Sequence, residues 1–226
     1  MTRRPEPGAA GIPVIVVHGL WNRGPESWLL RRRLAARLGR PVVKFRYPSV
    51  FRGLDENAAR LATFIDSHAP VDLVGYSFGG MVALDALRRL PAGSARRLVL
   101  VSSPVRGSAA ARSLLRRPRA GRWIVGRSAD TLAHGLDAGS PRVADLGVIA
   151  GTGGIGVGRA LGAMSGAHDG TVQVDETILD GSEKRLILPQ THTGMLFSRQ
   201  VADAIADFLE SGCFPDEGLS PPREPA

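Results

Sequence analysis

The chain has 226 residues, of which 43% are apolar and 22% charged, and its formal net charge is +8. These values are typical of a globular protein with one sizeable core, and they exclude a collagen, a coiled coil, a disulfide scaffold and a disordered chain. Arginine supplies all but two of the 29 basic residues, whereas aromatic residues make up only 5%. Because few aromatic side chains are available to stack on bases, we expect no nucleic-acid partner.

The same arithmetic favours a cytoplasmic protein. No apolar run approaches the roughly 20 residues of a membrane-spanning helix, and residues 1–10 lack the apolar stretch of a secretory signal. Cys213 is the only cysteine, which excludes a disulfide within the chain and is typical of a reducing compartment. Residues 1–10 and 213–226 are rich in proline and charge, so we expect both ends to be disordered around a single domain over 11–212.

Between these ends, short apolar runs alternate with helical patterns. Consecutive Val, Leu and Ile residues, typical of parallel strands buried on both faces, occupy 12–17, 42–46, 71–76, 97–102, 143–150 and 184–189. Apolar residues at helical spacing predict helices over 26–38, 56–67, 78–90 and 198–210. This alternation predicts an α/β fold, with a doubly wound, mainly parallel sheet of about six strands flanked by helices.

Two connections are longer than a helical crossover needs, and long connections commonly carry function. We expect the first, about 103–143, to form a small helical cap insert. Its stretch 106–127 interleaves arginines with apolar residues, which suggests either weak contact with a membrane surface or a solvated basic face. The second connection, 151–183, opens with the glycine-rich sequence GTGGIGVG.

The most informative motif is Gly75-Tyr-Ser-Phe-Gly-Gly80, directly after one predicted strand and directly before a predicted helix. A G-x-S-x-G sequence in this context predicts a nucleophile elbow, a turn so sharp that the residues two positions from Ser77 must lack bulk. The hydroxyl of Ser77 is then displayed at a helix N-terminus, where negative charge is favoured.

From residue 12 to residue 209 the sequence resembles the α/β-hydrolase superfamily, in particular its small bacterial lipase- and esterase-like members. The resemblance implies a reduced form of an eight-stranded parent fold, because only eleven residues precede the first predicted strand. It also implies a nucleophile at the elbow, an acid after a later strand and a histidine after the last strand.

An isolated serine hydroxyl is a poor nucleophile at neutral pH and needs a base held by an acid. His192 follows the last predicted strand, which is where the resemblance places the base. The resemblance also implies an oxyanion hole formed by the backbone N–H groups of Phe78 and Leu20. The residues expected to shape the substrate pocket around them are His18, Gly19, Trp21 and Tyr76.

The acid is assigned to Asp169, which stands in an Asp-Gly turn after the fifth predicted strand and before the base. Asp145 is an alternative, but it lies within a predicted strand. Asp175 and Glu176 resemble the acidic first turn of a short helix and remain further alternatives. His168, beside the preferred acid, either tunes it or is incidental.

The glycine-rich run 151–156 also matches G-x-G-x-x-G, a pattern of dinucleotide binding. Residues 157–166 contain three glycines and predict a poor helix, so we interpret the run as a flexible loop that carries the acid into place. We therefore expect no cofactor and no metal.

These observations predict a serine hydrolase that cleaves small carboxylic esters through an acyl-enzyme intermediate. A thioesterase or an acyltransferase could use the same triad. A non-catalytic ligand-binding protein that keeps the fold is the alternative of a different class. The oligomeric state is left open.

Overall fold

The structure is a computed structural model, and it describes residues 11–21, 26–116, 123–136, 143–179 and 184–215. The segment 1–10 and most of the tail 213–226, both expected to be disordered, lie outside the described residues. Six parallel strands form one sheet in the order β2-β1-β3-β4-β5-β6. They are β1 Val14–Val17, β2 Val42–Phe45, β3 Val71–Tyr76, β4 Ala95–Val101, β5 Asp145–Gly151 and β6 Lys184–Leu188.

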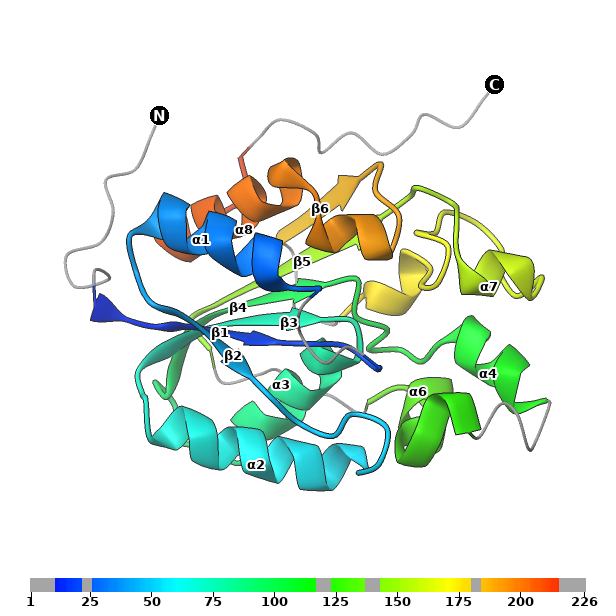
Figure 1. Ribbon diagram of the computed structural model, residues 1–226, viewed down its shortest axis with the longest axis horizontal. Coiled ribbons are helices and arrows are strands. Elements are labelled where there is room, and N and C mark those ends of the chain that lie inside the picture. Colours follow the sequence, from blue (N-terminus) through cyan, green and yellow to red (C-terminus); the bar gives the residue numbers. More distant parts are fainter. Residues whose placement is uncertain (1–10, 22–25, 117–122, 137–142, 180–183, 216–226) are drawn as a thin grey trace.

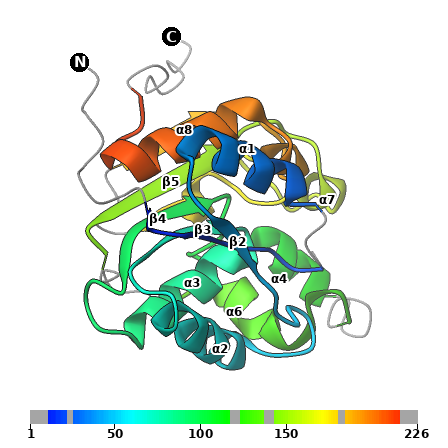
Figure 2. The ribbon, with the colours of Figure 1, turned by 60° about the vertical axis from the view of Figure 1, so that its left-hand side comes forward.

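Helices cover both faces of this sheet, as the alternating pattern predicts (Figure 1). Helices α1 Trp28–Leu38 and α8 Arg199–Ser211 pack together on one face. Helices α2 Leu54–Asp66 and α3 Phe78–Arg88 lie on the other face, and the turned view separates the two layers (Figure 2). The bounds of these helices and of the strands differ from the predicted ones by no more than two residues. The doubly wound parallel α/β fold is therefore confirmed.

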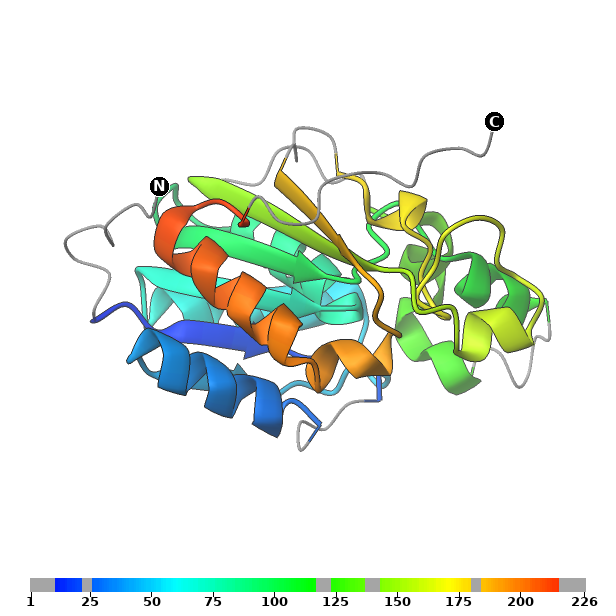
Figure 3. The same ribbon diagram turned by 90° about the horizontal axis from the view of Figure 1, so that it is seen from above.

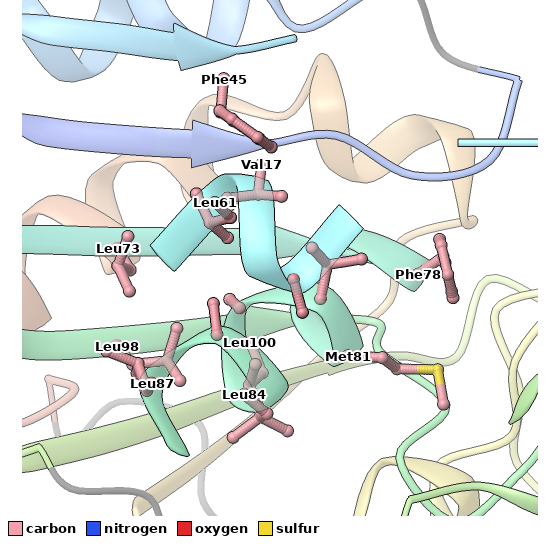
Figure 4. Packing of buried hydrophobic residues seen from close by; sticks show 14 of the residues in the cluster. Val17, Phe45, Leu61, Leu73, Phe78, Met81, Leu84, Leu87, Leu98 and Leu100 are labelled. Carbon is pink, nitrogen blue, oxygen red and sulfur yellow. The ribbon is translucent and has the colours of Figure 1, made fainter. Parts of the chain in front are cut away.

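The apolar runs of the strands form two cores, one on each face of the sheet. Side chains of α2 and α3 interdigitate with those of β1 to β4 in the first core, as Leu61, Leu84 and Leu100 illustrate (Figure 4). Helices α1 and α8 close the second core against side chains of β1 and of β3 to β6. Burial on both faces explains why the strands show no alternation of apolar and polar residues.

The long connections gather at the carboxyl ends of the strands (Figures 1 and 3). The predicted insert between β4 and β5 contains α4 Ala109–Leu115, the 3₁₀ turn η2 Gly126–Ser128 and α6 Ala129–His134. The connection between β5 and β6 contains α7 Val157–Ala160 and η3 Asp175–Thr177, and η4 Thr193–Leu196 follows β6.

The strand order reverses between β1 and β3, which are neighbours in the sheet although β2 separates them in sequence. The crevice at such a switch point is where open α/β sheets bind ligands. The segment that follows Val17 and the elbow that follows Tyr76 therefore meet at this position. None of the helices in the described part of the chain is long and apolar enough to cross a bilayer.

Candidate active site

Ser77 lies in a strained turn between β3 and α3, with φ 54° and ψ −127°. A side chain at a positive φ is disfavoured, and such strain is commonly found where function requires it. The turn closes only because its flanking residues are glycines. A Cβ at Gly75 would come within 2.4 Å of Gly80 Cα, and a Cβ at Gly79 within 2.3 Å of the carbonyl oxygen of Val17. The nucleophile elbow predicted from the sequence thus has the backbone geometry that its motif requires.

The structure brings Ser77, His192 and Asp169 together in one hydrogen-bonded chain. His192 Nε2 lies 3.1 Å from Ser77 Oγ, and His192 Nδ1 lies 2.7 Å from Asp169 Oδ2. The backbone N–H of His192 also donates to the carbonyl oxygen of Asp169 at 2.9 Å. The His192 side chain keeps 13% of its surface exposed, whereas that of Asp169 keeps 1%. The imidazole is therefore partly accessible to solvent, whereas the carboxylate that holds it is buried.

The turn that carries Asp169 stabilises its ionised form. Burial alone raises the pKa of Asp169, but the hydrogen bond and charge of His192, together with the backbone N–H groups of Val172 and Thr171, hold the pKa below its usual value. The two N–H groups donate to Asp169 Oδ1 at 2.7 and 2.8 Å. An ionised carboxylate can only accept, so His192 Nδ1 carries the proton and Nε2 is left to accept from the Ser77 hydroxyl.

The alternative acids lie elsewhere. Asp145 is the first residue of β5, at the end of the strand remote from the elbow, and it pairs with Arg97 Nε at 2.9 Å and with Lys184. Asp175 is exposed in η3. Neither carboxylate is hydrogen-bonded to His192 in the described structure.

Glu176 has a buried structural position that its sequence context does not indicate. Its carboxylate accepts the backbone N–H of Ala109 at 2.5 Å and that of Gln173 at 2.9 Å, and Arg112 lies 3.8 Å away. Its carbonyl oxygen accepts the N–H of Arg106 at 3.0 Å. Glu176 thus ties the segment that follows the Asp169 turn to the insert.

The predicted oxyanion donors lie on the two segments that meet at the switch point. Phe78 is the first residue of α3, and Leu20 follows β1. Within the described residues, neither backbone N–H donates to a protein acceptor. The backbone of Gly19 lies so close to the elbow that a Cβ there would be 3.0 Å from Ser77 Cβ. The segment that carries Leu20 therefore lies beside the elbow that carries Ser77 and Phe78.

Two of the predicted pocket residues, His18 and Tyr76, are buried and contact the backbone around the site. His18 is buried, its ring stacks on Tyr47 with centroids 4.3 Å apart, and its Nδ1 lies 2.9 Å from the carbonyl oxygen of Gly19. Tyr76 is also buried, and its hydroxyl donates to the carbonyl oxygen of His192 at 3.0 Å. These contacts hold the loops that surround Ser77.

Trp21, another of the predicted pocket residues, links the segment that follows β1 to the insert. It has a positive φ of 59°, and its indole N–H donates to the carbonyl oxygen of Ile124 at 2.6 Å. The side chain is 43% exposed. Trp21 is thus exposed next to Leu20, whereas Gly19 is buried against Ser77 and Tyr76.

The glycine-rich run lies as a wedge between the loop that carries His192 and the turn that carries Asp169. The N–H of Gly153 donates to Gln190 at 2.9 Å, and the N–H of Gly158 donates to Gly170 at 2.8 Å. A Cβ at Gly153 would lie 2.4 Å from the backbone nitrogen of Thr191. The helix that follows, α7, has only four residues, so the dinucleotide interpretation has no phosphate-binding helix. The run thus packs against the segments that carry both residues of the pair Asp169 and His192.

His168 accepts the N–H of Gly170 at its Nδ1, at 3.0 Å, and so supports the Asp-Gly turn. In the described ranges, no three His, Cys, Asp or Glu side chains are grouped so that they could hold a metal ion.

The chain belongs to the alpha/beta hydrolase family, whose model matches residues 14–207. No curated protein matches the chain. The sequence resemblance is thus confirmed at the level of the family.

Solved structures of bacterial hydrolases share the fold at low sequence identity. The mature form of a lipase from Bacillus licheniformis superposes with a TM-score of 0.73 at 17% identity, covering 93% of this chain and 96% of that one. An esterase from Exiguobacterium antarcticum gives 0.64 at 17% identity, with coverages of 89% and 93%. A thioesterase from the prodiginine pathway of Streptomyces coelicolor gives 0.59 at 17% identity, with coverages of 93% and 88%.

Proposed function

We propose that this chain is a serine hydrolase that cleaves carboxylic esters through an acyl-enzyme intermediate. The observation that carries the proposal is the hydrogen-bonded chain from Ser77 Oγ through His192 to Asp169, with the serine on a strained elbow. Family membership makes hydrolysis the expected class of reaction.

In the first half-reaction, Ser77 Oγ attacks the ester carbonyl carbon while His192 Nε2 takes the hydroxyl proton. The carbonyl oxygen gains negative charge, which the N–H groups of Leu20 and Phe78 stabilise. Collapse of the tetrahedral intermediate breaks the bond to the alcohol oxygen, and His192 returns the proton to that oxygen. The acyl group remains on Ser77 as an ester.

In the second half-reaction, water replaces the alcohol. His192 takes a proton from the water as it attacks the acyl carbon, and the proton then passes to Ser77 Oγ as the carboxylic acid leaves. Asp169 keeps its charge throughout and stabilises the imidazolium at each step. No step requires a group beyond these residues and water.

The experiment is a panel of p-nitrophenyl esters of graded acyl length, with one thioester, measured on the wild type and on two serine variants. We expect hydrolysis by the wild type, a loss of at least about a thousandfold in kcat for Ser77→Ala, and no loss for the matched control Ser67→Ala. Ser67 is exposed at the end of α2, remote from the elbow. Wild-type turnover by Ser77→Ala would contradict the proposal. A folded wild type that cleaves no ester would favour the binding protein.

A further inference from the structure

The exposed apolar side chains of this protein gather at one edge of the sheet. In the described part of the chain, every exposed large apolar side chain lies in a connection that follows a strand, before or at the start of the next helix, except that two lie beyond α4, in the insert between β4 and β5. The first group is Trp21, Trp28, Phe51, Ile155, Val157 and Phe197, and the two in the insert are Trp123 and Ile124. Strands are parallel, so all of these segments leave the carboxyl edge, the edge that holds Ser77. Scattered exposed apolar residues are ordinary, but a concentration around one site indicates a binding surface.

Four of these side chains form what we call the aromatic patch: Trp21, Phe51, Trp123 and Ile124. The rings of Trp21 and Trp123 have centroids 5.3 Å apart, and the Trp21 indole donates to Ile124. The segment that carries Phe51 contacts the insert, because the neighbouring carbonyl oxygen of Val50 accepts the N–H of Arg127 at 3.1 Å. Trp123 is 72% exposed and Phe51 69%. These rings are therefore exposed to solvent, and Trp21 directly follows Leu20.

The charge around the patch is positive. The described residues of the insert include four arginines, Arg106, Arg112, Arg116 and Arg127, all exposed, and one acid, Asp130. No carboxylate pairs with Arg116 or Arg127 among the residues described. Figures 1 and 3 show α4 and α6 of the insert beside α7 at this edge. A partner that covers the patch must accept apolar rings and supply negative charge.

We propose that the aromatic patch and the arginines of the insert dock this protein on an anionic phospholipid surface. Tryptophan and phenylalanine rings are favoured at the boundary between head groups and acyl chains, and arginines are attracted to anionic lipids. Docking in this orientation turns the carboxyl edge, with Ser77, toward the lipid. The docking goes beyond the proposed function and does not depend on hydrolysis.

The test measures cosedimentation with sonicated vesicles of phosphatidylcholine alone or mixed equally with phosphatidylglycerol. The reference protein is the full chain carrying Ser77→Ala, so that no lipid is consumed. We expect it to bind the anionic vesicles, to bind the neutral vesicles far less, and to be released from the anionic ones by high salt. Binding is thereby measured separately from activity, so failure of the hydrolase proposal would leave this result intact.

Two double variants in the reference background identify the surface. Trp123→Ser with Phe51→Ser should weaken binding by about tenfold. Arg116→Gln with Arg127→Gln should weaken it by about 25-fold, since each arginine near an anionic surface contributes about fivefold. The matched control is Arg60→Gln with Arg88→Gln, which removes two exposed arginines from α2 and α3 and should change binding less than about twofold. Circular dichroism of each variant checks the fold.

Absence of binding to anionic vesicles, or equal binding by the reference and both patch variants, would overturn the proposal. Light scattering provides a further outcome. A dimer that dissociates in the Trp123→Ser, Phe51→Ser variant would mean that a second copy covers the patch, which also overturns it.

Discussion

The hydroxyl of Tyr76 donates to the carbonyl oxygen of His192 at 3.0 Å, and the two rings have centroids 5.1 Å apart. Tyr76 immediately precedes Ser77, so one side chain joins the backbone that carries the proposed nucleophile to the backbone that carries the proposed base. Burial raises the pKa of Tyr76 well above its usual value, so the hydroxyl remains protonated and able to donate at any working pH. The distance between Ser77 and His192 therefore depends on a residue that need not touch substrate.

Tyr76→Phe tests this positioning role. The variant keeps the ring and removes the hydrogen bond to His192, so we expect kcat to fall about tenfold through a misplaced base while KM stays unchanged. Steady-state kinetics on a soluble p-nitrophenyl ester gives both constants. An unchanged kcat with a raised KM would instead place Tyr76 in the substrate pocket.

The role of Asp169 is tested against that of Asp145. In Asp169→Asn, an amide facing His192 Nδ1 can donate, which favours the tautomer whose Nε2 carries the proton and cannot accept from Ser77. We expect kcat to fall by about two to four powers of ten. Asp145→Asn should lower the thermal midpoint, because it weakens the pairing with Arg97 and Lys184 at the other end of β5, but should leave kcat within about threefold. The reverse pattern of losses would contradict the assignment.

The sequence predicted the sheet and the elbow because both are encoded locally. Consecutive apolar residues identify a strand buried on both faces, and the glycines around Ser77 identify the one turn that tolerates its strain. The supports of the site depend on contacts between distant segments, and no local pattern reports them. Examples are the hydrogen bond from Gly153 to Gln190 and the hydrogen bond from Ala109 to Glu176.

The glycine-rich wedge yields a prediction with a control in the same run. A Cβ at Gly153 would lie 2.4 Å from Thr191 N and would push the base loop away, so Gly153→Ala should lower kcat by at least about tenfold. The nearest atom to a Cβ at Gly154 would be 3.6 Å away, on the flexible side chain of Arg159. Gly154→Ala, at φ 71°, should therefore cost about 1 kcal/mol of stability and little activity. Equal kcat values for the two variants would show that the wedge does not position His192.

His18 should make stability depend on pH. Burial lowers the pKa of His18 below the usual 6.5, an effect that the hydrogen bond to Gly19 only partly offsets. Below about pH 6.5 the unfolded chain therefore binds a proton that the folded chain does not bind. The contribution of His18 to the free energy of unfolding is fully present above that pH and is lost as the pH falls toward the folded pKa. Urea unfolding from pH 7 to pH 5 should show a smaller loss for His18→Gln than for the wild type. Parallel curves would refute this account of His18.

The central claim is that Ser77 is an activated nucleophile, and covalent labelling tests it most directly. The folded wild type is treated with a fluorophosphonate, and its intact mass and labelled peptide are measured. We expect one label per chain, located on Ser77, with slower labelling of Asp169→Asn and no labelling of Ser77→Ala. A folded wild-type protein that takes no label, or a label on any residue other than Ser77, would contradict the account.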